Sequence, residues 1–170
     1  MSRLFSFPNP VNDYSARIVA GFVVALAVIT IALDQPWLTA IIALGFLLRA
    51  STGPKIDPIA ILVTRGIVPA LGDPNKPVPG PPKRFAQGLG FAMSTTAAVL
   101  ALGFGFVGAA YIVLIPLIVA ASLESFVGFC MGCWIFGYLM RFGVIPESVC
   151  LDCLDVQARQ RRLAGASKQG

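Results

Sequence analysis

The chain has 170 residues, of which 56% are hydrophobic and only 12% are charged, and its mean hydropathy is +0.80. Soluble domains carry about 25% charged residues, so this composition excludes an ordinary soluble protein and indicates an integral membrane protein. The net charge of +5 does not indicate nucleic-acid binding, because the basic residues are spread over several loops without aromatic partners. The chain contains no histidine, which excludes Ser-His and Cys-His nucleophilic catalysis.

The N-terminal part predicts a helix that stays in the membrane. Residues 1–14 form a polar lead-in, in which Asn12 and Asp13 are suited to cap a helix. Residues 15–33 are predicted to form a transmembrane helix, because about 20 apolar residues cross the hydrocarbon core. No small-residue cleavage pattern follows this stretch, so we do not expect a cleavable signal peptide.

A second helix is predicted over residues 37–49, with Asp34 suited to be its N-cap and Pro36 to its first turn. This helix is short for a span. Residues 58–68 form a still shorter apolar segment that we expect to stop at Pro69. At about 1.5 Å per residue, that segment is too short to cross a membrane. We expect it to lie at the membrane surface or to dip into one leaflet.

The second half of the chain repeats this order. The proline-rich residues 73–82 predict a solvated linker. Helices are predicted over residues 83–103 and 108–126, with a glycine-rich turn between them and a kink at Pro116. A second short apolar segment follows over residues 130–140, before a polar and basic tail.

The two halves share sequence patterns that indicate an internal duplication. In each half an arginine precedes a glycine by four residues near the start of the first helix, and an arginine precedes a proline after the short segment. The predicted organisation is a first hairpin repeat at residues 1–72, the linker at 73–82, a second hairpin repeat at 83–146 and a cysteine-containing tail at 147–170.

The positions of the basic residues predict how the chain lies in the membrane. All 13 Lys and Arg residues fall in the lead-in, the connection between the hairpins, the region of Arg141, the tail or the adjoining helix ends. The two hairpin turns carry none, so the positive-inside rule makes both termini and the linker cytoplasmic. We expect an all-α protein of the cytoplasmic membrane, in contact with lipid, with four transmembrane helices in two hairpins, each followed by a short cytoplasmic-side helix.

All four cysteines of the chain fall in two C-x-x-C pairs, Cys130/Cys133 and Cys150/Cys153. In the reducing cytosol, structural disulfides are not expected. The first pair directly precedes an apolar helix, whose dipole favours a thiolate. The four cysteines are therefore candidate catalytic residues for thiol redox chemistry or sulfur relay, and the second pair is suited to exchange with a soluble partner.

The same cysteines are compatible with a metal site. The spacing C-x2-C-x16-C-x2-C falls in the range expected for a four-cysteine zinc or iron site, which would clamp the tail to the membrane domain. A third interpretation, incidental packing of small residues, is disfavoured because the two motifs account for every cysteine. The spacing alone does not decide between redox chemistry and metal binding.

Three charged residues are candidates for supporting roles. Glu124 is the only charged residue in a long apolar stretch and lies shortly before Cys130, so it either pins the hairpins in an ion pair or relays protons to the thiols. Its expected partners are Arg17, Arg49 or Arg84. Arg17 and Arg84 are interpreted as interfacial anchors, with binding of a sulfur oxyanion as the functional alternative. The glycines expected to allow close helix packing are Gly21, Gly45, Gly88 and Gly90.

The run Phe129-Cys130-Met131-Gly132-Cys133-Trp134 and the second C-x-x-C pair resemble a bacterial membrane family that is catalogued as a domain of unknown function. The stretch that leads into the predicted helix at residue 83 is similar to that family as well, and the resemblance covers nearly the whole chain. Members are often encoded beside thioredoxin-like and rhodanese-type proteins. The resemblance therefore implies thiol or sulfur chemistry with a partner of one of these two kinds, without implying catalytic residues.

The sequence thus predicts a membrane-tethered thiol redox or sulfur-relay protein that uses no cofactor. The alternative is a scaffold protein whose four cysteines bind one zinc or iron ion. A transporter of a small sulfur species is a further alternative, although the sequence shows no polar stripe along a helix that could line a pore.

Overall fold

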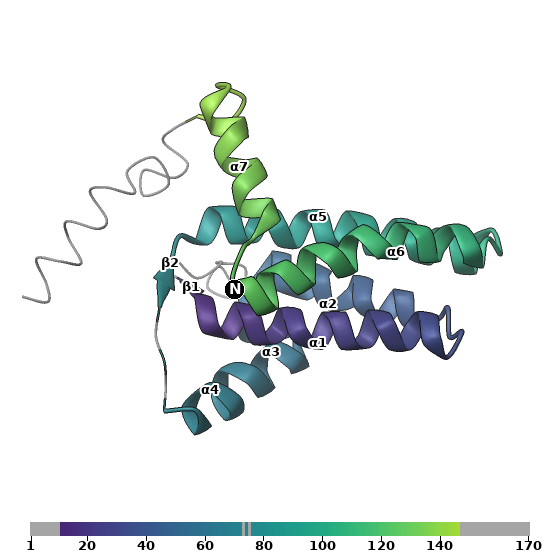
Figure 1. Ribbon diagram of the computed structural model, residues 1–170, viewed down its shortest axis with the longest axis horizontal. Helices are drawn as coiled ribbons and strands as arrows, with labels where there is room; N and C mark the ends of the chain where they lie inside the picture. The colour runs from purple at the N-terminus through teal and green to yellow at the C-terminus, as the bar shows by residue number, and fades with distance from the viewer. Residues whose placement is uncertain (1–10, 73, 75, 147–170) are drawn as a thin grey trace, which may run out of the picture.

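The computed structural model describes residues 11–72, 74 and 76–146. Four long helices lie side by side as a bundle: α1 (Asp13–Ala32), α2 (Leu38–Thr52), α5 (Gly80–Ala98) and α6 (Val107–Ser122) (Figure 1). Two π-helical turns, η3 (Val99–Gly103) and η4 (Leu123–Val127), extend α5 and α6. The α1–α2 and α5–α6 turns lie at the same end of the bundle. The described start of the chain and the shorter elements lie at the other end. We call it the basic end, because Arg17, Arg49, Lys83 and Arg84 fall in the helix segments there.

The shorter elements are arranged around the basic end. A 3-10 turn, η1 (Gly53–Lys55), leads into α3 (Pro58–Leu62), the π-helical turn η2 (Val63–Ile67) and α4 (Val68–Ala70), which together lie against α1. The strands β1 (Val11–Asn12) and β2 (Pro77–Val78) form one antiparallel pair. The last described helix, α7 (Met131–Arg141), runs across the direction of the bundle (Figure 1).

Three of these helices are long and apolar enough to cross a membrane. They cover Asp13–Ala32, Gly80–Gly103 and Val107–Val127. The α2 helix has 15 residues, fewer than the about 20 that a straight span requires. The described part of the chain is mostly helical and its strands form only the short β1–β2 pair, which fits a membrane protein of the all-α class.

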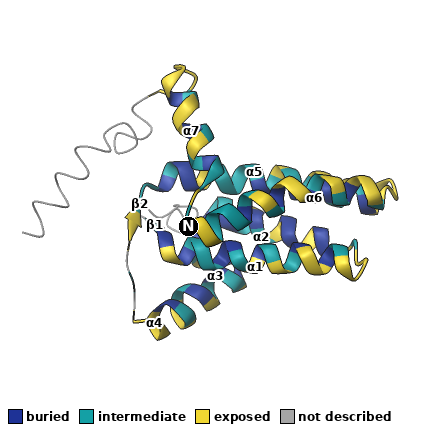
Figure 2. Cartoon of the chain, viewed as in Figure 1, coloured by how far each residue is buried: buried dark blue, intermediate teal, exposed yellow. Residues whose placement is uncertain are grey.

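The bundle core is built mainly from small residues. Ala27, Ala97, Ala110 and Leu114 are fully buried at the centre of the four helices. Buried hydroxyls such as that of Ser94 donate to carbonyls of the preceding turn of their own helix. Large apolar side chains instead cover the outside of the helices, where exposed patches extend along the bundle (Figure 2). This pattern is typical of helices surrounded by lipid, whose close packing relies on small residues.

One local prediction was wrong. Asp34 does not cap α2, which begins after Trp37 without a side-chain cap; the Asp34 carboxylate accepts a hydrogen bond from the Tyr111 hydroxyl at 2.7 Å. The short segment ends at Ala70, one residue beyond the predicted stop at Pro69. Within the proline-rich linker, β2 pairs with β1.

The α7 helix packs against α5 through Gly132. A Cβ atom at this position would lie 2.5 Å from the Cβ and 2.6 Å from the Cα of Ala86. The same helix face buries Phe136, whose ring centroid lies 5.6 Å from that of Phe85. Residue 132 can therefore carry no side chain while α7 keeps this position.

Replacing Gly132 with alanine is expected to push α7 away from α5 and to cost about 1–3 kcal/mol in the free energy of unfolding, the usual effect of overpacking. Gly137→Ala is the matched control on the same helix, because nothing lies within 4 Å of a Cβ there. The control is expected to be neutral or stabilising, since alanine favours a helix over glycine by about 1 kcal/mol. Equilibrium unfolding in detergent micelles measures both variants. Equal stability of the two variants would contradict the proposed contact.

Candidate functional site: a thiol pair beside a buried lysine

The corner between η4 and α7 positions the first cysteine pair. Gly128 ends η4 in the left-handed conformation, with φ of 76°, which a glycine adopts without strain. The Arg17 guanidinium packs beside it and donates to the carbonyls of Ser125 at 3.3 Å and Phe126 at 3.1 Å. These carbonyls lie at the helix end, where a cation is favourable. Arg17 therefore binds the backbone that leads into α7.

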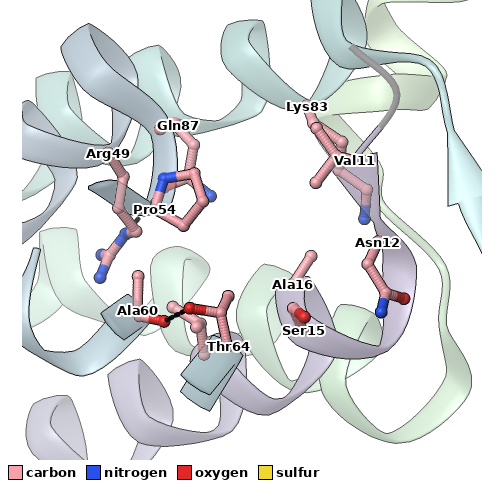
Figure 3. Close-up of a pocket in the computed structure, with 12 residues that line it drawn as sticks. Val11, Asn12, Ser15, Ala16, Arg49, Pro54, Ala60, Thr64, Lys83 and Gln87 are labelled. Atoms are coloured by element: carbon pink, nitrogen blue, oxygen red, sulfur yellow. Dashed lines mark hydrogen bonds between the residues drawn. The ribbon is translucent and has the colours of Figure 1, made fainter. Parts of the chain in front are cut away.

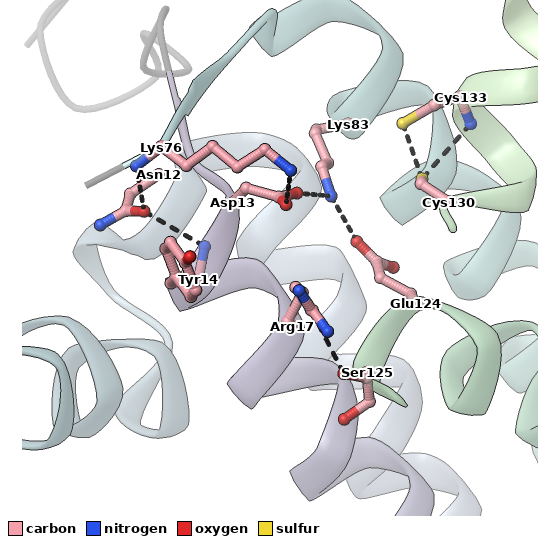
Figure 4. A network of polar contacts seen from close by, with 10 residues as sticks. All are labelled: Asn12, Asp13, Tyr14, Arg17, Lys76, Lys83, Glu124, Ser125, Cys130 and Cys133. Atoms are coloured by element: carbon pink, nitrogen blue, oxygen red, sulfur yellow. Dashed lines mark hydrogen bonds and ion pairs between the residues drawn. The ribbon is translucent and has the colours of Figure 1, made fainter. Parts of the chain in front are cut away.

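Cys130 is the N-cap residue of α7. Its Sγ accepts a hydrogen bond from the backbone N–H of Cys133 at 3.3 Å, and the two Sγ atoms lie 2.6 Å apart (Figure 4). Both cysteines are half-buried free thiols. The C-x-x-C spacing produces this contact because residues three apart lie on the same face of a helical turn.

A buried lysine lies near the thiol pair. The Lys83 ammonium, in the first turn of α5, contacts Glu124 Oε1 at 2.6 Å and Asp13 Oδ1 at 3.1 Å (Figure 4). Lys83 and Asp13 are each only 5% exposed. The exposed Lys76 lies 3.5 Å from the other oxygen of Asp13. This cluster of Asp13, Lys83 and Glu124, which we call the charge cluster, joins the start of α1, the start of α5 and the end of α6.

The surroundings make the two thiols unequal. The hydrogen bond from the Cys133 thiol lowers the pKa of Cys130, and the Lys83 ammonium and the Cys133 backbone N–H act in the same direction against burial and the Glu124 carboxylate. The pKa of Cys133 is raised, because its proton is shared with the Cys130 sulfur and because burial disfavours a thiolate. Cys130 is therefore the more acidic thiol and the better candidate nucleophile.

The inequality of the thiols predicts a specific pH dependence of alkylation. In a chain with Cys150→Ser and Cys153→Ser, Cys130 is expected to react with iodoacetamide faster at neutral pH than a free thiol does, because a lowered pKa leaves more thiolate. Adding Cys133→Ala removes the donated proton and is expected to move the pH profile to higher pH. Adding Cys133→Ser keeps a donor and is expected to move it less. Peptide mass spectrometry measures the rates, and identical profiles for the two variants would contradict the hydrogen bond.

A cavity of about 180 Å³ lies at the basic end between α1, the end of α2, α3 and the start of α5 (Figure 3). Its wall is mostly apolar, and the polar residues that line it are Asn12, Ser15, Arg49, Thr64, Lys83 and Gln87. Both basic groups are already ion-paired, so the cavity offers no uncompensated positive charge. Arg17 and Arg84, the candidates for oxyanion binding, are not among the residues that line it.

A family model described as "Domain of unknown function (DUF4395)" matches residues 11–141. The chain belongs to the DUF4395 family. No curated protein and no solved structure matches the chain. The part that matches DUF4395 extends from β1 to the end of α7, so it contains the charge cluster and Cys130/Cys133 but ends before Cys150 and Cys153. Membership in an uncharacterised family agrees with the resemblance that the cysteine motif carries.

The structure of this DUF4395 chain brings together only some of the predicted site residues. Cys130 and Cys133 are in contact, whereas Cys150 and Cys153 lie outside the described residues. Among the residues described, no group of three or more Cys, Asp or Glu side chains is placed to hold a metal ion. The zinc or iron site expected of all four cysteines stays a prediction, because two of its four ligands lie outside the described residues.

The predicted partner of Glu124 was wrong. Glu124 pairs with Lys83 rather than with Arg17, Arg49 or Arg84. Arg49 instead pairs with Asp57, and the Nε atom of Arg84 donates to the carbonyl of Ala50 at 3.0 Å.

Sequence analysis missed two members of the DUF4395 charge cluster. Lys83 had been assigned to the start of a transmembrane helix, and Asp13 to helix capping. The position of Lys83 in the first turn of an apolar helix was a usable signal. A charged residue at such a position must find a counter-charge or reach water. One lysine between two acidic residues from other helices satisfies that requirement.

Proposed function

We propose that this DUF4395 protein is a membrane-tethered thiol protein that exchanges electrons or sulfur with a soluble partner at the cytoplasmic face. The observation that carries the proposal is the contact between the Cys130 and Cys133 sulfurs in the first turn of α7. The thiols are unequal in acidity and half-buried. These are the properties of a dithiol that reacts through one sulfur and closes through the other.

We further propose that α2 crosses the membrane together with the three longer helices, as two hairpins with both termini cytoplasmic. The distribution of charge supports this topology. The turns at residues 33–37 and 104–106 carry no Lys or Arg. The basic residues of the described part fall in segments at or near the opposite end of the bundle (Figure 1): Arg17 near the start of α1, Arg49 near the end of α2, Lys55 in η1, Arg65 in η2, Lys76 just before β2, Lys83 and Arg84 near the start of α5, and Arg141 at the end of α7. The positive-inside rule then makes the basic end cytoplasmic.

In the redox form of the proposal, the Cys130 thiolate attacks one sulfur of a disulfide in a thioredoxin-like partner. A mixed disulfide forms, and the other partner sulfur leaves as a thiolate that takes a proton from water. Cys133 loses its proton and attacks the Cys130 sulfur, which breaks the mixed disulfide and releases the partner as a dithiol. Two electrons pass to the partner, and the reverse sequence reduces the pair.

In the sulfur-relay form, Cys130 takes the outer sulfur of a persulfide on a rhodanese-type partner, whose cysteine leaves as a thiolate. The Cys130 persulfide passes this sulfur to an acceptor thiolate without net oxidation. In the absence of an acceptor, Cys133 attacks the Cys130 sulfur and displaces hydrosulfide. That last step leaves a Cys130–Cys133 disulfide, so both forms make the same bond.

The test uses anaerobically purified full-length protein in detergent, equilibrated with mixtures of reduced and oxidised dithiothreitol and then alkylated. A disulfide between Cys130 and Cys133 is expected to form and break reversibly and to be reduced by thioredoxin. Cys130→Ser and Cys133→Ser are each expected to abolish it. The Cys150→Ser/Cys153→Ser chain is expected to keep the disulfide but to exchange with thioredoxin more slowly. A polysulfide donor that adds one sulfur at Cys130 in the Cys133→Ser chain favours the relay form.

The four-cysteine spacing supports a second candidate, a structural site in which Cys130, Cys133, Cys150 and Cys153 bind one zinc or iron ion. Metal analysis of the same anaerobic preparation separates the candidates. One metal ion per chain with four unreactive thiols would reject the redox proposal. Metal-free protein with a reversible Cys130–Cys133 disulfide would reject the metal site.

A further inference from the structure

The α7 helix has two different faces. One face buries Gly132, Phe136 and Met140 against the start of α5. Residues at spacings of four form a ladder of aromatic side chains away from this buried face, which we call the aromatic ladder: Trp134, Tyr138 and Phe142. Their exposed fractions are 53%, 43% and 76%.

The members of the aromatic ladder contact one another. The ring centroids of Trp134 and Tyr138 lie 4.5 Å apart in an edge-on arrangement, and those of Tyr138 and Phe142 lie 6.3 Å apart. A row of three large rings along a short helix is more apolar surface than a water-exposed helix usually presents. All three side chains are exposed to the surroundings of the protein.

The connection to α6 determines the depth of α7 relative to the membrane. The helix begins at Met131, shortly after the membrane-crossing stretch ends at Val127, and it runs across the bundle direction instead of continuing along it (Figure 1). The exposed Phe126 and Val127 continue the apolar outer surface of α6 up to this corner. A helix that leaves the end of a span at this angle follows the plane of the membrane surface.

The residue types favour lipid as the occupant of this face. Trp and Tyr are enriched where the acyl chains meet the headgroups, because they combine an apolar ring with a polar group. Arg141, exposed at the last position of α7, belongs to the basic end of the protein. A positive charge there suits the anionic headgroups of a cytoplasmic leaflet.

We propose that α7 lies in the headgroup region of the membrane with its aromatic ladder inserted among phospholipids. The helix then holds Cys130 and Cys133 at the membrane surface. The inference rests on the proposed membrane topology and not on the thiol chemistry, so the experiment below and the redox titration can fail independently.

Tryptophan fluorescence tests this inference directly, because the chain has only two tryptophans, Trp37 and Trp134. Trp37 lies exposed at the α1–α2 turn, so Trp37→Phe leaves Trp134 as a single reporter in a folded protein. The variant is reconstituted into vesicles of phosphatidylcholine and phosphatidylglycerol that contain nitroxide-labelled lipid. The depth of Trp134 follows from how strongly its fluorescence is quenched by three agents: a nitroxide near the headgroup, a nitroxide deep in the acyl chain, and acrylamide in the aqueous phase.

Trp134 is expected to be quenched about twofold more strongly by the shallow nitroxide than by the deep one, as an interfacial helix requires, and only weakly by acrylamide. Two further reporters calibrate the depth. In Trp134→Phe, Trp37 reports the opposite surface. In the chain lacking both tryptophans, Ile115→Trp reports the exposed middle of α6, where the deep nitroxide is expected to dominate.

Three results would overturn the inference. Strong quenching of Trp134 by acrylamide with little effect of either nitroxide would place the aromatic ladder in water. Protection from all three quenchers would mean that protein covers it, from a second copy of the chain or from the tail. Dominant quenching by the deep nitroxide would also contradict an interfacial position, since α7 would then dip into the bilayer core.

Discussion

Replacing Lys83 with methionine is expected to lower the free energy of unfolding by about 3–5 kcal/mol, because the change removes one partner of a buried ion pair. Methionine preserves most of the side-chain volume. The loss in the free energy of unfolding therefore measures the removal of the charge and not a change in packing. The Asp13 and Glu124 carboxylates would be left near each other without the ammonium that lies 3.1 and 2.6 Å from them. Equilibrium unfolding in detergent micelles measures the loss.

Two further variants control this experiment. Lys76→Met removes an ammonium that also faces Asp13 but is 59% exposed, and it is expected to cost about 0–1 kcal/mol, as surface ion pairs do. Adding Glu124→Gln to Lys83→Met removes one of the two stranded charges and is expected to recover part of the stability. If Lys83→Met costs no more than Lys76→Met, Lys83 does not hold the charge cluster together.

Replacing Arg49 with methionine is expected to have an effect of similar size, about 3–5 kcal/mol. Its guanidinium is 2.9 Å from the Asp57 carboxylate, donates to Gln87 at 3.1 Å and lies 4.7 Å above the ring of Phe46. Asp57 is 2% exposed and also accepts from the backbone N–H of Ala60, which caps α3. The pair therefore ties the end of α2 to the start of α3.

A double-mutant cycle isolates this interaction. Asp57→Asn keeps an acceptor for the α3 cap but strands the Arg49 charge. The combination of both changes is expected to cost clearly less than the sum of the two single changes, because neither charge is then left alone. The exposed Arg65→Met is the surface control and is expected to be nearly neutral. Additive costs in the cycle would contradict a direct coupling of Arg49 to Asp57.

Much of the bundle could be predicted because hydrophobic runs and their interruptions are local properties of the sequence. The cap at Asn12 was predicted, and its side chain accepts from the Tyr14 N–H, although α1 begins at Asp13 and not at the predicted residue 15. The contact within Cys130/Cys133 likewise follows from a spacing of three residues at a helix start. Both predictions needed only neighbouring residues.

The remaining features depend on which helices meet, and no local pattern encodes that. The pairing of Glu124 with Lys83 joins residues 41 positions apart. Gly88 and Gly90 lie two residues apart on one helix, yet only Gly90 faces a neighbour, the ring of Phe46, while nothing lies near Gly88. Gly132 was read only as part of a cysteine motif, although its contact with Ala86 sets the position of α7. Such differences need the three-dimensional packing.

The N-cap position of Cys130 has a mechanical consequence. The Cys130 and Cys133 sulfurs are in contact within one turn of the chain, so a disulfide between them would close a loop of only four residues. Under the proposed chemistry, a change of oxidation state would therefore be confined to the first turn of α7. In that case the four-helix bundle and the buried face of α7 would keep their packing while the bond forms and breaks.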